Sequence, residues 1–258
     1  MTRLEFAFQS DIGEVRPTNQ DRILAKADIL DGCSCGLFCV ADGMGGLSDG
    51  HFASSLSVEI LEKWWKNRLP EIKNNIDTSF IFEEFTHLFT KINEQILEKA
   101  KQDSTQIGTT CSLLFVLNDD YYIAHSGDTR IYAVQKKLIQ NQITQLTEDH
   151  TWLVDQLKAG VYTEETVRTH PHRNRLTGCL GVFEKPRIAF STGQVSKNSV
   201  FILATDGLYR NVNTKEMARH ATRHTNIEYL VSELVNLSSK RGAVDNISVV
   251  AVNVKRGE

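Results

Sequence analysis

The chain has 258 residues and a formal net charge of −3 at pH 7, and 41% of its residues are hydrophobic. The weak negative charge offers no basic field for nucleic acid, so a nucleic-acid-binding role is disfavoured. No apolar run approaches the roughly 18 to 20 residues that span a bilayer, and the first residues lack a secretory apolar core. We therefore expect a cytoplasmic protein that is not inserted into a membrane.

The pattern of residues favours one domain over the whole chain, residues 1–258. A length of 258 residues suits one large domain or two small ones. Only four prolines are present, and no low-complexity or single-sign charge run interrupts the apolar pattern. Cys39 and Cys111 lie inside apolar runs and the cysteine count of five is odd, so we expect reduced thiols rather than a disulfide framework.

Short apolar runs predict a protein rich in β-strands. The three consecutive runs between residues 111 and 134 are joined too closely for crossover helices, so we expect them to form one antiparallel meander. That arrangement disfavours a doubly wound parallel sheet. The predicted strands cover residues 4–9, 36–41, 111–117, 121–126, 130–134, 187–191, 199–205 and 247–254.

Helices are predicted in separate blocks between these strands. Apolar residues repeat every three or four positions across residues 52–64 and 85–96, which predicts two long amphipathic helices packed as an antiparallel pair. A third such helix is predicted from about residue 226 to 238. Together with the strands, this order predicts an α+β fold in which two packed antiparallel sheets have helices outside. The segment from about residue 147 to 181 is expected to be an excursion from the sheets.

Four acids stand beside these strands, far apart in the sequence. Asp42, Asp128 and Asp206 follow apolar runs, and Asp245 precedes the last one. Each acid alone would be an ordinary turn residue, since Asp-Gly after a strand is a common hairpin signal. Taken together they suit Mg²⁺ or Mn²⁺, which prefer hard oxygen ligands, and Asp42 is placed to bridge two ions. Such a pair activates water and clamps an oxyanion, so we expect hydrolysis of a phosphate ester.

Two further residues near the first strand fit this chemistry. The guanidinium of Arg16 is a rigid fork that matches a phosphate, although a surface pair with Glu14 or Asp21 is the ordinary alternative. Asp21 lies five residues further on and is placed to hold metal-bound water from outside the coordination shell.

At this point the chain resembles the metal-dependent protein serine/threonine phosphatases called PPM or type 2C, particularly the compact bacterial members. One such motif would be weak evidence, whereas the ordered set is specific. The matching stretches, in chain order, are Ser10 to Gly13 and Asn19 to Asp21, Val40 to Gly46, Gly108 to Thr110, Ser126 to Arg130, Leu146 to His150, His170 to Thr177, Ala204 to Leu208, and Asp245 to Asn246.

The resemblance implies a four-layer α-β-β-α sandwich with a binuclear Mn²⁺ or Mg²⁺ centre that removes phosphate from phosphoserine or phosphothreonine. Asp42 would bridge both ions, the Gly43 carbonyl would bind the first, and Asp206 and Asp245 would bind the second. The remaining roles follow the same motifs: Asp21 would orient water on the first ion, Asp128 would help hold a third, weaker ion, and Arg16 would grip the substrate phosphate. The catalytic residues would then be Arg16, Asp42 and Asp206.

The resemblance also sets expectations about mechanism and partners. A bridging water would attack phosphorus directly, and residues 147–181 would form the variable flap. Met44 stands where many eukaryotic members carry a histidine that is proposed as the general acid, so the acid for the leaving group is unassigned. Gln20 stands where many have an acid, which predicts weak metal binding at the first ion. We expect a monomer whose partners are phosphorylated proteins, among them a Ser/Thr kinase and its substrates.

Two other functions fit the residues less well. A regulatory pseudophosphatase that only binds phosphoproteins would be signalled by loss of Asp42, Asp206 or Asp245, and all three are present. A two-metal nuclease would need a basic track for its polyanionic substrate, and the scattered Lys and Arg residues provide none.

Overall fold

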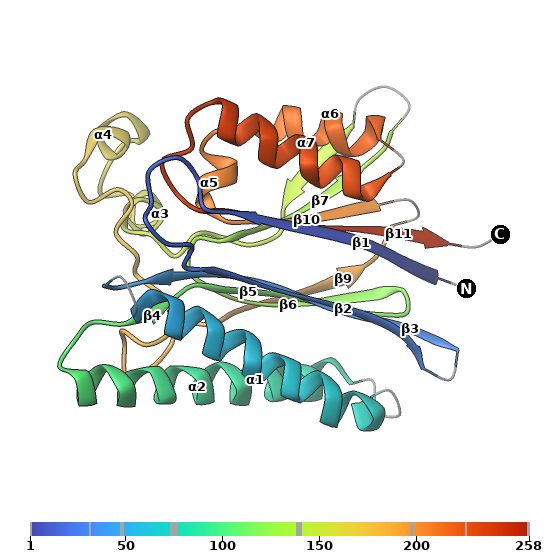
Figure 1. The fold of residues 1–258 in the computed structure, drawn as a ribbon, viewed down its shortest axis with the longest axis horizontal. Coiled ribbons are helices and arrows are strands. Elements are labelled where there is room, and N and C mark those ends of the chain that lie inside the picture. Colours follow the sequence, from blue (N-terminus) through green and yellow to red (C-terminus); the bar gives the residue numbers. More distant parts are fainter. Residues whose placement is uncertain are drawn as a thin grey trace.

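Two antiparallel β-sheets pack face to face, and helices cover the outer face of each (Figure 1). The computed structural model describes residues 2–30, 32–46, 49–72, 77–137, 141–196, 199–224 and 226–256. The predicted α+β fold, a four-layer α-β-β-α sandwich, is confirmed.

The first sheet holds both ends of the chain and has the strand order β1-β11-β10-β7-β8. All its neighbouring strands are antiparallel, and β1 pairs with β11 along its whole length, from Thr2 opposite Arg256 to Asp11 opposite Ile247. Its strands are β1 (Thr2–Asp11), β7 (Arg130–Gln135), β8 (Gln142–Gln145), β10 (Ser199–Ala204) and β11 (Ile247–Arg256).

The second sheet has the strand order β2-β3-β5-β6-β9, with the short β4 paired to β3. Strand β3 is buried on both faces, because Leu37 and Cys39 pack toward the helices while Phe38 and Val40 pack between the sheets. That burial explains its continuous apolar run. The strands are β2 (Asp21–Leu30), β3 (Cys33–Met44), β4 (Gly108–Thr109), β5 (Cys111–Leu117), β6 (Asp120–Ser126) and β9 (Ala189–Gln194).

The helices fall into an outer layer on each sheet and a group at one end. The predicted pair of long helices is present as α1 (Asp49–Ile72) and α2 (Thr78–Asp103), which lie side by side below the second sheet in Figure 1. Asp77 caps α2 by accepting a hydrogen bond from the Ser79 amide. The other helices are α3 (Trp152–Lys158), α4 (Glu164–Thr169), α5 (Asp206–Tyr209), α6 (Thr214–Arg223) and α7 (Ile227–Lys240).

One expectation about the strands is wrong. Strands β5 and β6 pair with each other, but β7 belongs to the opposite sheet, where it pairs with β10 and β8. The turn at Gly127, whose φ of 120° suits glycine, carries the chain from one sheet to the other. The predicted meander therefore ends after two strands, and Asp128 sits where the chain crosses between the sheets.

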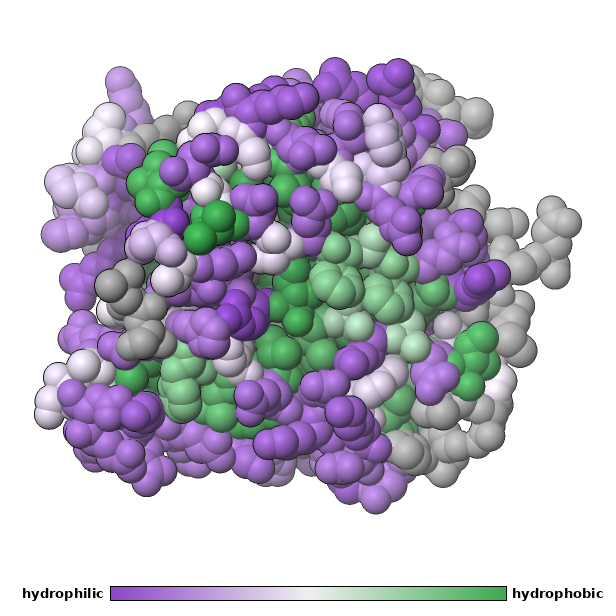
Figure 2. All heavy atoms as spheres, viewed as in Figure 1, coloured by the Kyte–Doolittle hydropathy of each residue, from purple (hydrophilic) through white to green (hydrophobic). Residues whose placement is uncertain are grey.

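Figure 2 shows hydrophilic residues over the outer helices and hydrophobic residues at the surface between them, at the level of the two sheets. On the edge strand β1, the hydrophobic residue Phe8 has 55% of its surface exposed. In the described part of the chain, no helix combines the length and the apolar character that a membrane crossing requires.

Candidate active site

The acids that the sequence singled out meet at one end of the sandwich. Asp42 lies near the end of β3, Asp128 lies between β6 and β7, Asp206 follows β10 and Asp245 precedes β11. They line a cleft of about 350 Å³. The full lining is Arg16, Gln20, Asp42, Gly43, Met44, Gly45, Thr110, Asp128, Asn174, Leu176, Asp206, Arg210, Asp245 and Asn246.

The backbone around Asp42 is fixed by the loop before β5. The Asp42 amide donates to the Thr110 hydroxyl at 2.9 Å, and its carbonyl accepts from the Thr110 amide at 2.9 Å and the Thr109 hydroxyl at 3.0 Å. Asp42 therefore stays within a strand and does not form a hairpin turn. These bonds involve only backbone atoms of Asp42, so they position its carboxylate and do not use the carboxylate oxygens.

Gly43 allows the chain to pass very close to the start of α1. A Cβ atom on Gly43 would lie 2.0 Å from the Gly50 carbonyl oxygen, which is a clash with backbone that cannot move aside. Its amide donates to the Gln20 carbonyl at 3.3 Å. The position thus demands glycine, and it brings the Gly43 backbone to the wall of the cleft.

Asp21 lies beneath the cleft and does not line it. It stands opposite Asp42 on the neighbouring strand, and only 2% of its surface is exposed. Its Oδ2 atom accepts a 2.9 Å hydrogen bond from the hydroxyl of Thr205, which directly follows β10 of the other sheet. The Thr205 hydroxyl accepts in turn from the Ser248 amide at 2.9 Å. Asp21 is therefore held by a polar link between the two sheets.

Asp206 begins a short helix, so the hairpin alternative is wrong for this acid. It is the first residue of α5 and is 7% exposed. Arg210, one helical turn later, forms an ion pair with its Oδ2 atom at 2.8 Å. Arg210 also lines the cleft and was not predicted as a site residue. The i, i+4 spacing is a signal only once a helix is known to start at Asp206.

Arg16 pairs with Asp245 and not with Glu14 or Asp21. Its Nε and Nη2 atoms donate to the two carboxylate oxygens of Asp245 at 2.8 and 2.6 Å. The loop that carries Arg16 is fixed by Asn246, whose side-chain amide donates to the Ile12 and Thr18 carbonyls and whose oxygen accepts from the Gln20 amide. The structure thus brings a phosphate-binding fork to the acids.

Asp128 is 8% exposed and is held from one side by Tyr209, whose hydroxyl donates to the Asp128 carbonyl at 3.0 Å. The guanidinium of Arg130 lies over the Tyr209 ring, 3.8 Å from its centroid. Arg130 pairs with Asp149 at 2.6 Å and not with the neighbouring Asp128. Asp149 therefore holds Arg130, Arg130 packs on Tyr209, and Tyr209 orients the backbone at Asp128.

Burial and mutual repulsion disfavour ionisation of the gathered acids. Burial is the main cause that raises the pKa of Asp21 to about 7 and the pKa of Asp128 to about 6, and the charge of Asp206 adds to both shifts. Burial also raises the pKa of Asp42 and of Asp206, with neighbouring acids contributing. A divalent cation among these groups would reverse the balance, because it favours the ionised forms.

The donor set fits hard divalent ions. Four carboxylates line the cleft together with the backbone of Gly43, and none of the described lining residues is a cysteine or a histidine. Two buried carboxylate oxygens, Asp21 Oδ1 and Asp206 Oδ1, have no hydrogen-bond partner within the described residues. Buried anionic oxygens without donors are costly, and metal ions or their waters supply the missing partners.

The segment of residues 147–181 also reaches the cleft. Asn174 and Leu176 line it, and neither was predicted as a site residue. The histidines of this segment, including His150 and His170, are not among the described residues that line it. Asn174 and Leu176 reach the cleft because the turn after α4 folds back past the start of α3. There the Trp152 amide donates to the Arg175 carbonyl at 2.8 Å.

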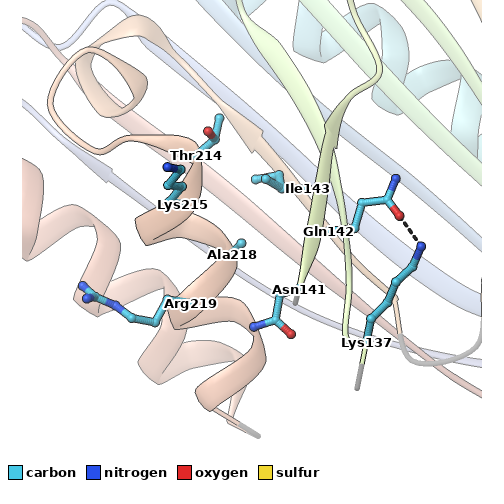
Figure 3. Close-up of a pocket in the computed structure, with 8 residues that line it drawn as sticks. All are labelled: Lys137, Asn141, Gln142, Ile143, Thr214, Lys215, Ala218 and Arg219. Carbon is cyan, nitrogen blue, oxygen red and sulfur yellow. Dashed lines mark hydrogen bonds between the residues drawn. The ribbon is translucent and has the colours of Figure 1, made fainter. Parts of the chain in front are cut away.

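A wider cavity of about 670 Å³ lies elsewhere, between β8 and α6 (Figure 3). Its charged lining residues are Lys137, Lys215 and Arg219. Lys137 already binds the Gln142 side chain, as Figure 3 shows. None of the described residues that line this cavity is a carboxylate, so the smaller acidic cleft is the better candidate for the active site.

Comparison with known proteins supports this fold. The family profile described as "Protein phosphatase 2C" matches residues 15–245. "Protein phosphatase PhpP" of Streptococcus pneumoniae strain D39 is 28% identical over 254 residues, which cover 97% of this chain and 98% of that protein. The solved serine/threonine phosphatase of S. agalactiae is 27% identical, with a TM-score of 0.87, over 97% of this chain and 99% of that one.

A more distant solved structure has the same fold. It is the catalytic domain of the serine threonine protein phosphatase PstP in complex with 2 manganese ions, 21% identical with a TM-score of 0.78 over 99% of this chain and all of that one. The fold and these relatives define the class of the molecule, which is a serine/threonine protein phosphatase. The chain belongs to the protein phosphatase 2C family.

Proposed function

We propose that the cleft holds two Mn²⁺ or Mg²⁺ ions and that water bridging them attacks the phosphorus of phosphoserine or phosphothreonine directly. Asp42 would bridge the ions, the Gly43 carbonyl would bind the first, and Asp206 and Asp245 would bind the second. The observation that carries this proposal is the convergence of carboxylates from separate strands on one cleft. The manganese in the PstP structure supports the choice of metal.

The protein groups have separate tasks in this proposal. Arg16 would release Asp245 to the metal and turn its fork to the substrate phosphate, since the two partners compete for one guanidinium. Asp21 would accept hydrogen bonds from metal-bound water, because its Oδ1 atom is buried without a partner while Thr205 holds Oδ2. The Asp21 side chain is already fixed in place by Thr205, which lowers the cost of ordering it during reaction.

Asp128 would help hold a third, weaker ion, and a water on this ion is the proposed acid for the leaving alkoxide. The side chain that follows Gly43 is Met44, which has no proton to give and lines the cleft. Gln20 brings an uncharged side chain to the first ion, which supports weak metal affinity there. Residues 147–181 would act as the flap of a single domain spanning residues 1–258, with Asn174 and Leu176 beside the substrate.

The physiological setting is part of the same proposal. We place the enzyme in the cytoplasm as a monomer that opposes a Ser/Thr kinase and acts on that kinase and its substrates. The curated and solved relatives are phosphatases of the same family, which supports phosphoproteins as substrates.

Phosphate release from a phosphothreonine peptide tests the site. We expect the intact chain to need Mn²⁺ and the Asp206→Asn variant to lose about 100-fold or more of its activity, because a ligand with one anionic oxygen less holds the ion poorly. Asp103→Asn is the matched control, since Asp103 is an exposed acid on α2 that pairs with Lys99.

Two outcomes would contradict the proposal. Equal activity of Asp206→Asn and Asp103→Asn would remove Asp206 from the metal site. A folded intact chain that binds Mn²⁺ yet releases no phosphate from several peptides would favour the regulatory pseudophosphatase instead.

A further inference from the structure

A cluster of nitrogen and oxygen ligands lies outside the active-site cleft, between α6 and α7. His220 and His224 come from α6 and its C-terminal cap, and Glu233 comes from α7. One ligand atom from each lies within 4.8 Å of the others. None of the three residues lines the active-site cleft. We infer that His220, His224 and Glu233 form a second metal site, specific for Zn²⁺ or a similar ion that favours imidazole nitrogen.

The backbone sets up the two histidines as a pair. Residues four apart lie on one face of a helix, and the His224 amide donates to the His220 carbonyl at 3.2 Å, so this turn is formed. The two imidazole rings are nearly parallel, with an angle of 28° and centroids 5.8 Å apart. The Tyr229 ring packs edge-on against His224 with centroids 4.6 Å apart, which limits rotation of that imidazole.

One ring nitrogen in the cluster lacks a partner. His220 Nδ1 is buried and has no hydrogen bond within the described residues. A buried polar atom without a partner destabilises the fold, so natural structures rarely retain one without a reason. Two charged side chains act on His220 in opposite senses, because the negative charge of Glu233 favours its protonated form and the positive charge of Arg219 disfavours it. The cluster is therefore not a simple ion pair between His220 and Glu233. A bound cation would complete the coordination of the cluster.

The residue types select the ion. Imidazole with one carboxylate suits Zn²⁺, Cu²⁺ or Ni²⁺, whereas Mg²⁺ and Mn²⁺ prefer the all-oxygen set of the cleft. Zinc bonds of about 2.0 to 2.2 Å place neighbouring tetrahedral ligands about 3.3 Å apart, so small side-chain rotations would close the present spacing. Three protein ligands leave one position for water. The ion would join α6 to α7 across the connection at residues 224–226.

A second group of histidines provides the competing explanation. His170 and His172 lie in the segment of residues 147–181 with ring centroids 5.4 Å apart. His170 stacks on Trp152 at 4.1 Å, so its face is used for packing. The carboxylate that accompanies the histidines of α6 has no counterpart in this group among the described residues. We therefore place the zinc at His220, His224 and Glu233.

Zinc binding by the full chain, prepared without a histidine tag, tests the inference. Binding of Zn²⁺ is measured by equilibrium dialysis with excess Mg²⁺, in the intact protein and in Asp206→Asn, so that a site in the cleft is recognised. We expect one zinc that persists in Asp206→Asn and whose affinity falls about 100-fold or more in His224→Gln and in Glu233→Gln. His87→Gln, at an exposed histidine of α2, should bind zinc like the intact chain.

Thermal unfolding and Co²⁺ spectra keep the test decisive if a variant folds poorly. Zinc at a hundredfold excess over its Kd should raise the Tm of the intact chain by about 5 °C or more, and should not raise it in His224→Gln. Bound Co²⁺ should show the strong visible absorption of a four-coordinate ion. The inference is overturned if zinc binding survives in both His224→Gln and Glu233→Gln, or if it is lost in His172→Gln or Asp206→Asn instead.

Discussion

At the scale of single residues, two arginines form ion pairs with acids that the proposed metal ions need as ligands. Arg16 binds both carboxylate oxygens of Asp245, and Arg210 binds Asp206 at 2.8 Å. A metal ion and a guanidinium compete for the same oxygens, so each pair lowers the affinity of its acid for the ion. Arg210 is 44% exposed in its side chain, so water and salt screen its charge.

We expect Arg210→Gln to lower the Mn²⁺ concentration needed for half-maximal activity. An exposed ion pair is worth up to about 1 kcal/mol, which corresponds to about fivefold in affinity. A titration of phosphate release with Mn²⁺ measures the change. Arg210→Lys keeps the charge and serves as the control, and it should need nearly as much Mn²⁺ as the intact chain. Equal requirements in the glutamine and lysine variants would show that the pair does not compete with the ion.

The sequence revealed the acids of the cleft but not their partners. Asp42, Asp128, Asp206 and Asp245 were predicted from strand ends, and the structure brings all four to one cleft. Arg210 was missed because its pairing depends on a four-residue helix that apolar periodicity cannot reveal. Asn174 and Leu176 were missed for a different reason: only the tertiary fold brings their turn to the cleft.

At the scale of elements, the buried side chain of Asn93 connects α2 to the chain before β9. Its oxygen accepts from the Gly181 amide at 2.7 Å, and its nitrogen donates to the Phe183 and Glu184 carbonyls at 3.0 and 3.3 Å. Gly181 has a φ of 89°, and a Cβ there would lie 2.2 Å from Ile96 Cγ2. This turn therefore depends on one helical side chain for its backbone hydrogen bonds.

We expect Asn93→Ala to lower the free energy of unfolding by about 2 to 3 kcal/mol, because it leaves buried backbone groups without partners. Urea unfolding followed by circular dichroism measures the loss. Thr86→Ala, at an exposed position of the same helix, should change stability by less than about 0.5 kcal/mol. A loss at Asn93 as small as that at Thr86 would mean that water replaces the bonds at no cost.

Elements with continuous or periodic apolar residues were predicted, and polar ones were not. The charged residues Arg22, Lys26 and Asp28 interrupt the apolar pattern of β2, which is an edge strand. Helix α6 buries only Met217, Ala218 and Ala221, too few for a clear stripe. Strand β7 was predicted but placed in the wrong sheet, because a short connection permits either a hairpin or a crossing between sheets.

At the scale of the whole molecule, a buried polar pair lies at the point where the chain changes sheets. His125 is 1% exposed, and its Nε2 atom donates to the Glu148 carbonyl at 3.0 Å while Nδ1 lies 2.8 Å from the Ser112 hydroxyl. His150 packs against it with ring centroids 4.8 Å apart. Burial lowers the pKa of His125 to about 4 and the pKa of His150 to about 3.

These shifts make folding sensitive to acid. The unfolded chain protonates His125 near pH 6.5, whereas the folded chain does so near pH 4, so stability is full above pH 6.5 and is lost as the pH falls to 4. A shift of this size corresponds to about 3 kcal/mol. Asp21 and Asp128 act in the opposite sense, because their raised pKa values favour the folded state at low pH. In the intact protein, the stability that these acids gain at low pH offsets the stability that His125 loses. A pH series on the intact protein alone therefore does not separate the two effects.

A comparison with His125→Gln separates the two effects, because both proteins share the acids. A glutamine amide keeps a donor for the Glu148 carbonyl but takes up no proton. Between pH 7 and pH 4, we expect the intact chain to lose about 3 kcal/mol more of its unfolding free energy than the variant does. Urea unfolding at each pH, with a chelator to remove metal ions, measures this difference. His87→Gln should follow the intact chain, since His87 is exposed. Parallel changes in the intact chain and His125→Gln would show that the buried His125 accepts a proton without cost to the fold.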